Sequence, residues 1–215
     1  MERKVLQDFY GADYVKMDYY TGNTSMVEQM VNWYGLDDKY SSLFPDIGDD
    51  DPEASFSDVP YEKGSQFMYY IESLIGEEFM QMYLRDYILN FHGMAINQAD
   101  KRAFYEAWLV DNFPDTADDL ILSTKWDEWV FEPGVAPTLT SETFFVPAID
   151  AGQKLARAYV ALGGMASPGD ITEEQEDLGS VSYTDYFTYF KAQKETFVNE
   201  LKVLDGVDPL LMAYI

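Results

Sequence analysis

Histidine and cysteine, which often hold metals or act as nucleophiles, are nearly absent from this chain of 215 residues, which has one His and no Cys. A zinc peptidase site of the H-E-x-x-H type needs two His on one helix face as ligands and a Glu as general base. The single His92 cannot make that motif, and it leaves little scope for a catalytic triad. Its place in Asn90-Phe91-His92-Gly93, at a predicted helix end, favours a partner for the helix dipole. The sequence therefore predicts no metal-binding residues in this chain.

A run of carboxylates, Asp49-Asp50-Asp51-Pro52-Glu53, is the next candidate for chemistry. It lacks the alternation and the closing glutamate of a calcium-binding EF-hand loop, and it is typical of an exposed turn. The chain also has no phosphate-binding P-loop, no dinucleotide glycine fingerprint and no Gly-x-Ser-x-Gly elbow. Nucleotide chemistry and serine hydrolysis are therefore not indicated.

Tyr61 is the third candidate, in the segment Val59-Pro60-Tyr61-Glu62-Lys63-Gly64. Asp58 is expected to cap a helix whose first turn tolerates Pro60, because the amide that proline lacks would have no partner there. This helix has an apolar stripe and a stop at Gly76; the stripe is Phe67, Tyr70, Ile71, Leu74 and Ile75. Taken alone, Tyr61 could be an ordinary half-buried helix residue among 17 tyrosines.

Two further helices should pack beside the helix that carries Tyr61. One is predicted from about Glu77 to Asn90, with Phe79, Met82, Tyr83 and Tyr87 facing inward. The next should open at Asn97, whose spacing from Asp100 is that of a capping box, and should end before Pro114. Glycines between these helices imply tight turns. We therefore expect an antiparallel α-helical lobe, preceded by a helix that contains Val5, Leu6, Phe9 and Tyr10.

Helix-breaking residues gather between Glu132 and Pro147, which predicts a linker over 133–147 between a domain of residues 1–132 and a second one of residues 148–215. The short apolar run Phe144-Phe145-Val146 is not expected to form a strand. Beyond the linker we predict an amphipathic helix from Ile149, an acidic loop through Gly179, and a second helix that includes Tyr186 and Leu201. Asp208-Pro209 should start one more helix. Both chain ends are expected to cut through helices.

Composition limits the possible partners. The net charge of −25 repels nucleic acid and anionic membranes, so neither is an expected partner. An acidic surface could attract cationic peptides or a basic partner, or it could be solvated. The chain shows no signal-peptide pattern, no membrane-spanning stretch and no cysteine, which together predict a cytoplasmic protein.

Three segments together resemble the gluzincin zinc aminopeptidases related to leukotriene A4 hydrolase. They are Val59-Pro60-Tyr61-Glu62-Lys63-Gly64, Trp126-Asp127-Glu128-Trp129 and Pro133-Gly134-Val135-Ala136-Pro137, in matching order and spacing. The resemblance implies a mainly α fold. Residues 1–132 would be the helical lobe of a thermolysin-like zinc-peptidase catalytic domain, and residues 148–215 the beginning of an α-helical, armadillo-like C-terminal domain.

The resemblance also implies roles for three residues. Tyr61 would be the catalytic tyrosine, whose hydroxyl donates a hydrogen bond to the oxyanion formed during peptide hydrolysis. Glu53 holds the position of an acidic residue, usually Asp, in the substrate channel, although it could equally be a solvated part of the acidic run. Phe56 replaces a second active-site tyrosine, and the loss of that hydroxyl argues against lipid epoxide hydrolase activity.

Two features of the family are missing: the H-E-x-x-H motif and the glycine-rich segment that holds the substrate amino terminus. The resemblance implies that Met1-Glu2-Arg3 lies just after the family's third zinc ligand. We therefore expect no cofactor in this chain, with zinc in the complete enzyme.

Two hypotheses follow. In the first, the chain is part of a zinc aminopeptidase that acts on peptides. This part is inactive alone, and a metal-binding half in the same or another chain completes the active site. The second is a non-catalytic acidic helical module that binds a protein partner through an exposed apolar face.

Overall fold

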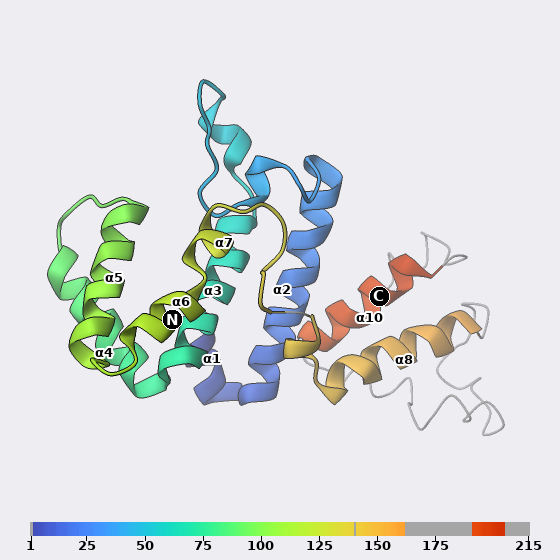
Figure 1. Ribbon diagram of the computed structural model, residues 1–215. Coiled ribbons are helices and arrows are strands. Elements are labelled where there is room, and N and C mark those ends of the chain that lie inside the picture. The colour runs from blue at the N-terminus through green and yellow to red at the C-terminus, as the bar shows by residue number, and fades with distance from the viewer. Residues whose placement is uncertain (1, 140, 162–190, 205–215) are drawn as a thin grey trace. The chain divides into compact units, whose positions relative to one another are not determined.

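The computed structural model describes residues 2–139, 141–161 and 191–204, and in these residues every regular element is a helix (Figure 1). The predicted mainly α fold is confirmed. The chain divides into two units, which are considered separately: Met1–Gly22 with Ser141–Ile215, and Asn23–Thr140. None of the described helices combines the length and the apolar character that a membrane-spanning segment requires. The α-helices are α1 (Glu2–Tyr10), α2 (Ala12–Trp33), α3 (Val59–Ile75), α4 (Glu77–Phe91), α5 (Gln98–Asn112), α6 (Ala117–Thr124), α7 (Trp126–Val130), α8 (Pro147–Ala161) and α10 (Lys191–Val203).

The length of α2 is a feature that sequence patterns missed. The segment after residue 19 is rich in Tyr, Gly and Ser, and no helix was predicted there, yet α2 continues to Trp33. Its second half buries Met26 and Met30 in one cluster with Val59, the first residue of α3. Helix propensity is a weak preference that tertiary packing overrides. Packing against α3 therefore stabilises the second half of α2, where the local sequence has no strong preference for a helix.

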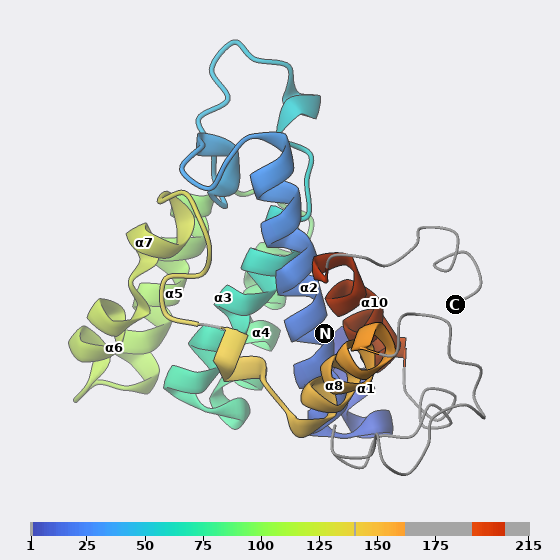
Figure 2. The ribbon, with the colours of Figure 1, turned by 90° about the vertical axis from the view of Figure 1, so that its right-hand side faces the viewer.

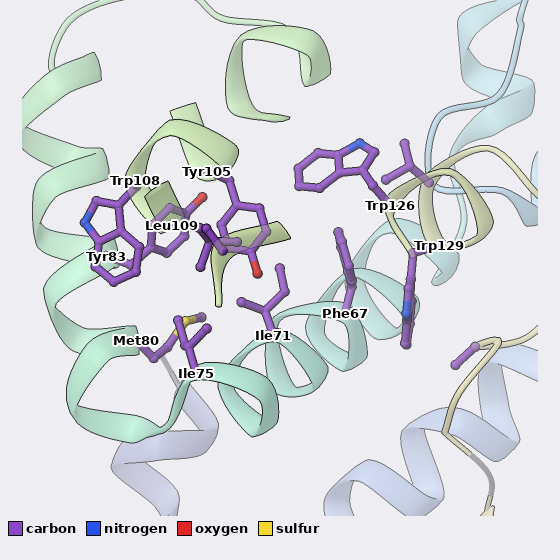
Figure 3. Packing of buried hydrophobic residues seen from close by; sticks show 13 residues of the cluster. Phe67, Ile71, Ile75, Met80, Tyr83, Tyr105, Trp108, Leu109, Trp126 and Trp129 are labelled. Atoms are coloured by element: carbon purple, nitrogen blue, oxygen red, sulfur yellow. The ribbon is translucent and has the colours of Figure 1, made fainter. Parts of the chain in front are cut away.

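The core of the Asn23–Thr140 unit is built by helices α3 to α7 (Figure 3). Gly76, at φ +85°, makes the sharp turn from α3 to α4, and the predicted 77–90 helix is confirmed with one more residue. Trp129 is fully buried, and its ring stacks on Phe67 with a centroid distance of 5.1 Å. Trp126 meets the edge of Phe67 at 5.4 Å. Both tryptophans therefore anchor the core.

The predicted capping box at the start of α5 is present. The Asn97 side chain accepts hydrogen bonds from the N–H groups of Ala99 and Asp100 at 2.8 and 3.0 Å, and the Asp100 carboxylate accepts from the Asn97 N–H at 3.0 Å. These bonds satisfy amides that have no partner inside the helix.

We predict that Asn97→Ala lowers the free energy of unfolding by about 1 kcal/mol, because α5 loses its N-terminal hydrogen bonds. Urea denaturation followed by far-UV circular dichroism measures this loss. Asn90→Ala is the matched control, since Asn90 is exposed in the last turn of α4 and is expected to tolerate Ala. Equal stabilities of the Asn97→Ala chain and the unchanged chain would contradict the prediction.

In the other unit, α8 and α10 pack side by side (Figure 2). Gly152 permits this approach, because a Cβ there would lie 3.0 Å from the backbone oxygen of Gln193. Residues 141–144 form a 3-10 helix, and Pro147 begins α8, so no strand forms at Phe144-Phe145-Val146. The predicted acidic loop, the part around Tyr186 of the second helix predicted beyond the linker, and Asp208-Pro209 lie outside the described residues. The boundaries 1–132, 133–147 and 148–215 stay a prediction about domains.

Candidate functional site

Tyr61 lies in the first turn of α3 and points its side chain outward. The residue is 63% exposed, and its backbone N–H donates to the carbonyl of Asp58 at 3.1 Å. Its ring meets the edge of the Phe56 ring at a centroid distance of 6.4 Å. Within the described part of the chain, the Tyr61 hydroxyl has no hydrogen-bond partner. A phenol donor is therefore held on a regular helix and is accessible from outside.

The start of α3 differs in detail from the predicted cap. Asp58 is the N-cap residue, as expected, but its backbone is helical (φ −72°, ψ −13°) and its side chain makes no capping hydrogen bond. The buried hydroxyl of Ser57 accepts instead from the N–H of Val59 at 3.3 Å. The Asp58 N–H donates to the side-chain oxygen of Gln29 on α2 at 2.6 Å. A helix that is distant in the sequence thus helps to fix the turn that precedes Tyr61.

Glu53 and Phe56 lie just before this turn. Glu53 belongs to a 3-10 helix, Pro52–Ser55, whose N-cap Asp51 accepts the Glu53 N–H at 3.0 Å. The Glu53 side chain is exposed, and its backbone carbonyl accepts the N–H of Phe56 at 3.0 Å. Phe56 is 69% exposed. The structure therefore brings the rings of Phe56 and Tyr61 together, with Glu53 one turn earlier on the same surface segment.

The loop that leads to Glu53 is held by a group of polar side chains. The Asp50 carboxylate accepts hydrogen bonds from the Lys39 ammonium at 2.6 Å and from the Tyr40 hydroxyl at 2.7 Å. These two donors lower the pKa of Asp50, and the carboxylate raises the pKa of Lys39. The acidic run thus includes a residue with two defined partners.

Lys63 is a residue of this region that sequence patterns assigned no role. It is 0% exposed, and its Nζ donates to the backbone carbonyls of Glu132 at 2.9 Å and Ser41 at 3.2 Å. Burial lowers the pKa of Lys63 to about 8, against the opposing charge of Glu132. One signal could have revealed its burial: Lys63 lies four residues from Val59 and four from Phe67, on the buried face of α3.

This lowered pKa predicts how stability varies with pH. Unfolding returns Lys63 to its ordinary pKa of 10.5, so between about pH 8 and 10.5 the unfolded chain binds more protons than the folded chain. The Lys63 contribution to stability therefore rises with pH across this window, by up to about 3 kcal/mol in total. Urea denaturation at several pH values measures it. Lys63→Met should lack this part of the rise, and an identical pH dependence in both chains would contradict the prediction.

The residues described here do not fit the zinc that the family resemblance implies. His92 is exposed and occupies the C-cap position of α4, in agreement with its predicted place at a helix end. Across residues 2–139, 141–161 and 191–204, no group of three or more His, Cys, Asp or Glu is arranged to hold a metal ion. The whole sequence has one His. An H-E-x-x-H site needs ligands that these residues do not supply.

Comparison with known proteins finds a family match over the first part of the chain. Residues 1–129 match the Peptidase family M1 domain. Leucine aminopeptidase 2 of Emericella nidulans is 30% identical over 139 residues, which cover 64% of this chain and 22% of that protein. A leukotriene A-4 hydrolase homolog of Botryotinia fuckeliana is 28% identical over 173 residues, covering 80% of this chain and 26% of that protein. The chain thus spans about a quarter of the length of these relatives.

Solved structures show the same fold. Yeast leukotriene A4 hydrolase in complex with bestatin superimposes with a TM-score of 0.72 at 20% sequence identity, over 96% of this chain and 31% of that one. The native enzyme from Saccharomyces cerevisiae gives a TM-score of 0.67 at 18% identity, over 97% of this chain and 31% of that one. The helical arrangement is therefore shared with part of a larger protein.

Proposed function

The chain belongs to peptidase family M1, and on that premise we propose that it is part of a zinc aminopeptidase that hydrolyses N-terminal residues from peptides. Its relatives include proteins named leucine aminopeptidase 2. The observation that carries the proposal is the exposed Tyr61 phenol, which is held on the first turn of α3 without a hydrogen-bond partner in the described residues. We assign Tyr61 the role of oxyanion-stabilising residue.

The chemistry of a phenol suits this role. Attack on a peptide carbonyl places negative charge on its oxygen, and a donor that is already in position stabilises this charge without reorganisation. The hydrogen bond is stronger to the charged oxygen than to the ground-state carbonyl, so it lowers the barrier more than it tightens substrate binding. Because Tyr61 lies on a helix whose preceding turn is bonded to Gln29, its backbone can keep one position during the reaction.

Glu53 and Phe56 are proposed to contact the substrate. The exposed Glu53 carboxylate would attract the positive amino terminus or a basic side chain of a peptide, and Phe56 would offer an apolar surface beside Tyr61.

The zinc of family enzymes supplies a Lewis acid, and its ligands must come from residues outside this chain. We therefore propose that the chain alone is inactive and is completed by a metal-binding half. We also propose a cytoplasmic location, which the absence of cysteine supports.

A chimera tests the proposal. Residues 1–129 of this chain replace the matched segment of Leucine aminopeptidase 2 from Emericella nidulans, which retains its own sequence upstream. Hydrolysis of an aminoacyl amide that a chelator abolishes would support the proposal, whereas the chain alone should show no turnover. A folded chimera that binds zinc and lacks activity would contradict it. The relative with its own segment is the positive control.

A second candidate function, a non-catalytic binding module, is favoured by one observation. Phe44 and Phe131 are 51% and 41% exposed, and their rings meet edge to face at a centroid distance of 6.1 Å. Contiguous exposed apolar patches mark protein-binding surfaces, and this ring pair is the proposed centre of such a patch. If this surface binds a partner, Phe44→Ser with Phe131→Ser should reduce self-association or copurification, measured by sedimentation. A chain that is monomeric and without partners at all concentrations would argue against this candidate.

A further inference from the structure

A buried ammonium lies on the inner side of the helix segment that carries Tyr61. Residues 61 and 63 are two positions apart, which places them about 200° apart around an α-helix. Tyr61 accordingly faces outward and is 63% exposed, whereas Lys63 faces inward and is 0% exposed. Because both residues belong to the first turns of the same helix, the bonds that hold the Lys63 side chain also hold the backbone that carries the Tyr61 phenol.

The two carbonyls that bind Lys63 come from distant parts of the Asn23–Thr140 unit. Ser41 is 22 residues before Lys63, and Glu132 is 69 residues after it. These two segments are also bonded to each other: the Ser41 hydroxyl accepts the Gly134 N–H at 2.7 Å, and the Phe44 N–H donates to the Val130 carbonyl at 3.0 Å. Lys63 thus joins the start of α3 to a pair of segments that are already held together.

We propose that Lys63 is the positioning residue for Tyr61: by binding the carbonyls of Ser41 and Glu132, it sets the place and direction of the first turns of α3. The inference rests on the proposed function in one respect, since Tyr61 is the group that it positions. Lys63 itself touches neither substrate nor reacting atoms.

Stability alone does not account for a lysine at this place. Burying an ammonium is costly, and replacing a buried charge by an apolar side chain of similar volume is often neutral or stabilising. A methionine could fill the space between Val59 and Phe67 on the buried face. What it could not do is donate hydrogen bonds to two carbonyls. The two directional hydrogen bonds therefore explain the presence of a lysine at position 63 better than the burial of its side chain does.

Carbon-detected NMR of the ¹³C-labelled chain tests the proposal through the titration of Lys63. The carbonyl ¹³C signals of Ser41 and Glu132 should move with a common midpoint near pH 8, where Lys63 loses its proton. The backbone ¹³C signals of Val59 and Tyr61 should move at the same midpoint. Among the described residues, Glu132 is the charged group that acts on Lys63.

Two variants sharpen this test. Lys63→Met should abolish the common midpoint and displace the Tyr61 signals already at pH 7. Lys101→Met is the matched control: burial also lowers the pKa of Lys101, but its Nζ lies 3.8 Å from the sulfur of Met68 on another part of α3. This control should keep the midpoint at Ser41, Glu132 and Tyr61.

Movement of the Ser41 and Glu132 signals without Tyr61 would overturn the proposal, as would the absence of any midpoint near pH 8. If Lys63→Met does not fold, the titration of the unchanged chain decides the question by itself. The test needs neither zinc nor turnover. If Tyr61 made no contribution to turnover in the chimera, this result would contradict the proposed function, but it would leave the proposed positioning of Tyr61 by Lys63 intact.

Discussion

Tyr61→Phe in the chimeric peptidase is expected to lower kcat by about 10²–10³, because one preorganised donor to the oxyanion is lost. KM should change little, since the bond forms mainly in the transition state. The variant removes a single oxygen and keeps the ring beside Phe56, whose centroid is 6.4 Å away. Steady-state hydrolysis of an aminoacyl amide over a range of substrate concentrations measures both constants.

Tyr10→Phe is the matched control for this prediction. Tyr10 is 55% exposed and lies at the end of α1, so the variant removes a phenol hydroxyl of similar exposure far along the sequence from Tyr61. Its kcat should equal that of the unmodified chimera. If Tyr61→Phe kept full kcat while binding zinc normally, Tyr61 would be an ordinary surface tyrosine and the catalytic assignment would be wrong.

The second large effect is expected at Trp129, a fully buried residue of the Asn23–Thr140 core (Figure 3). Trp129→Ala should lower the free energy of unfolding by about 3–5 kcal/mol, because the change removes buried apolar surface and leaves a cavity. The indole is 0% exposed and stacks on Phe67 and Tyr70 with centroid distances of 5.1 and 5.6 Å. A loss of this size is about one-fifth or more of the 5–15 kcal/mol that is usual for the free energy of unfolding of a domain.

Two other variants separate packing from other causes. Trp129→Phe should cost less, since an aromatic ring remains and the buried indole N–H has no hydrogen-bond partner in the described residues. Leu122→Ala on α6 should change stability by less than about 0.5 kcal/mol, because Leu122 is 79% exposed. Urea denaturation followed by circular dichroism compares all three. A Trp129→Ala chain as stable as Leu122→Ala would contradict the packing described here.

Helix boundaries show how far local sequence can be read. The capping box of Asn97 and Asp100, the first-turn Pro60 and the turn at Gly76 were all predicted, and all three are present. Each depends on residues within a few positions of one another, so the sequence contains the whole signal. The length of α2 was not predicted, because it depends on packing of Met26 and Met30 against Val59, about 30 residues away.

The sequence by itself determined the mainly α fold and, through its three motifs, a resemblance that the M1 match confirms over residues 1–129. Tertiary structure alone decided which backbone carbonyls the Lys63 ammonium binds. It also decided that Ser57 and Gln29, rather than the Asp58 side chain, bond the amides at the start of α3. The physical reason is distance along the chain. The partners of Lys63 lie 22 and 69 residues away, and only folding brings their carbonyls to its ammonium.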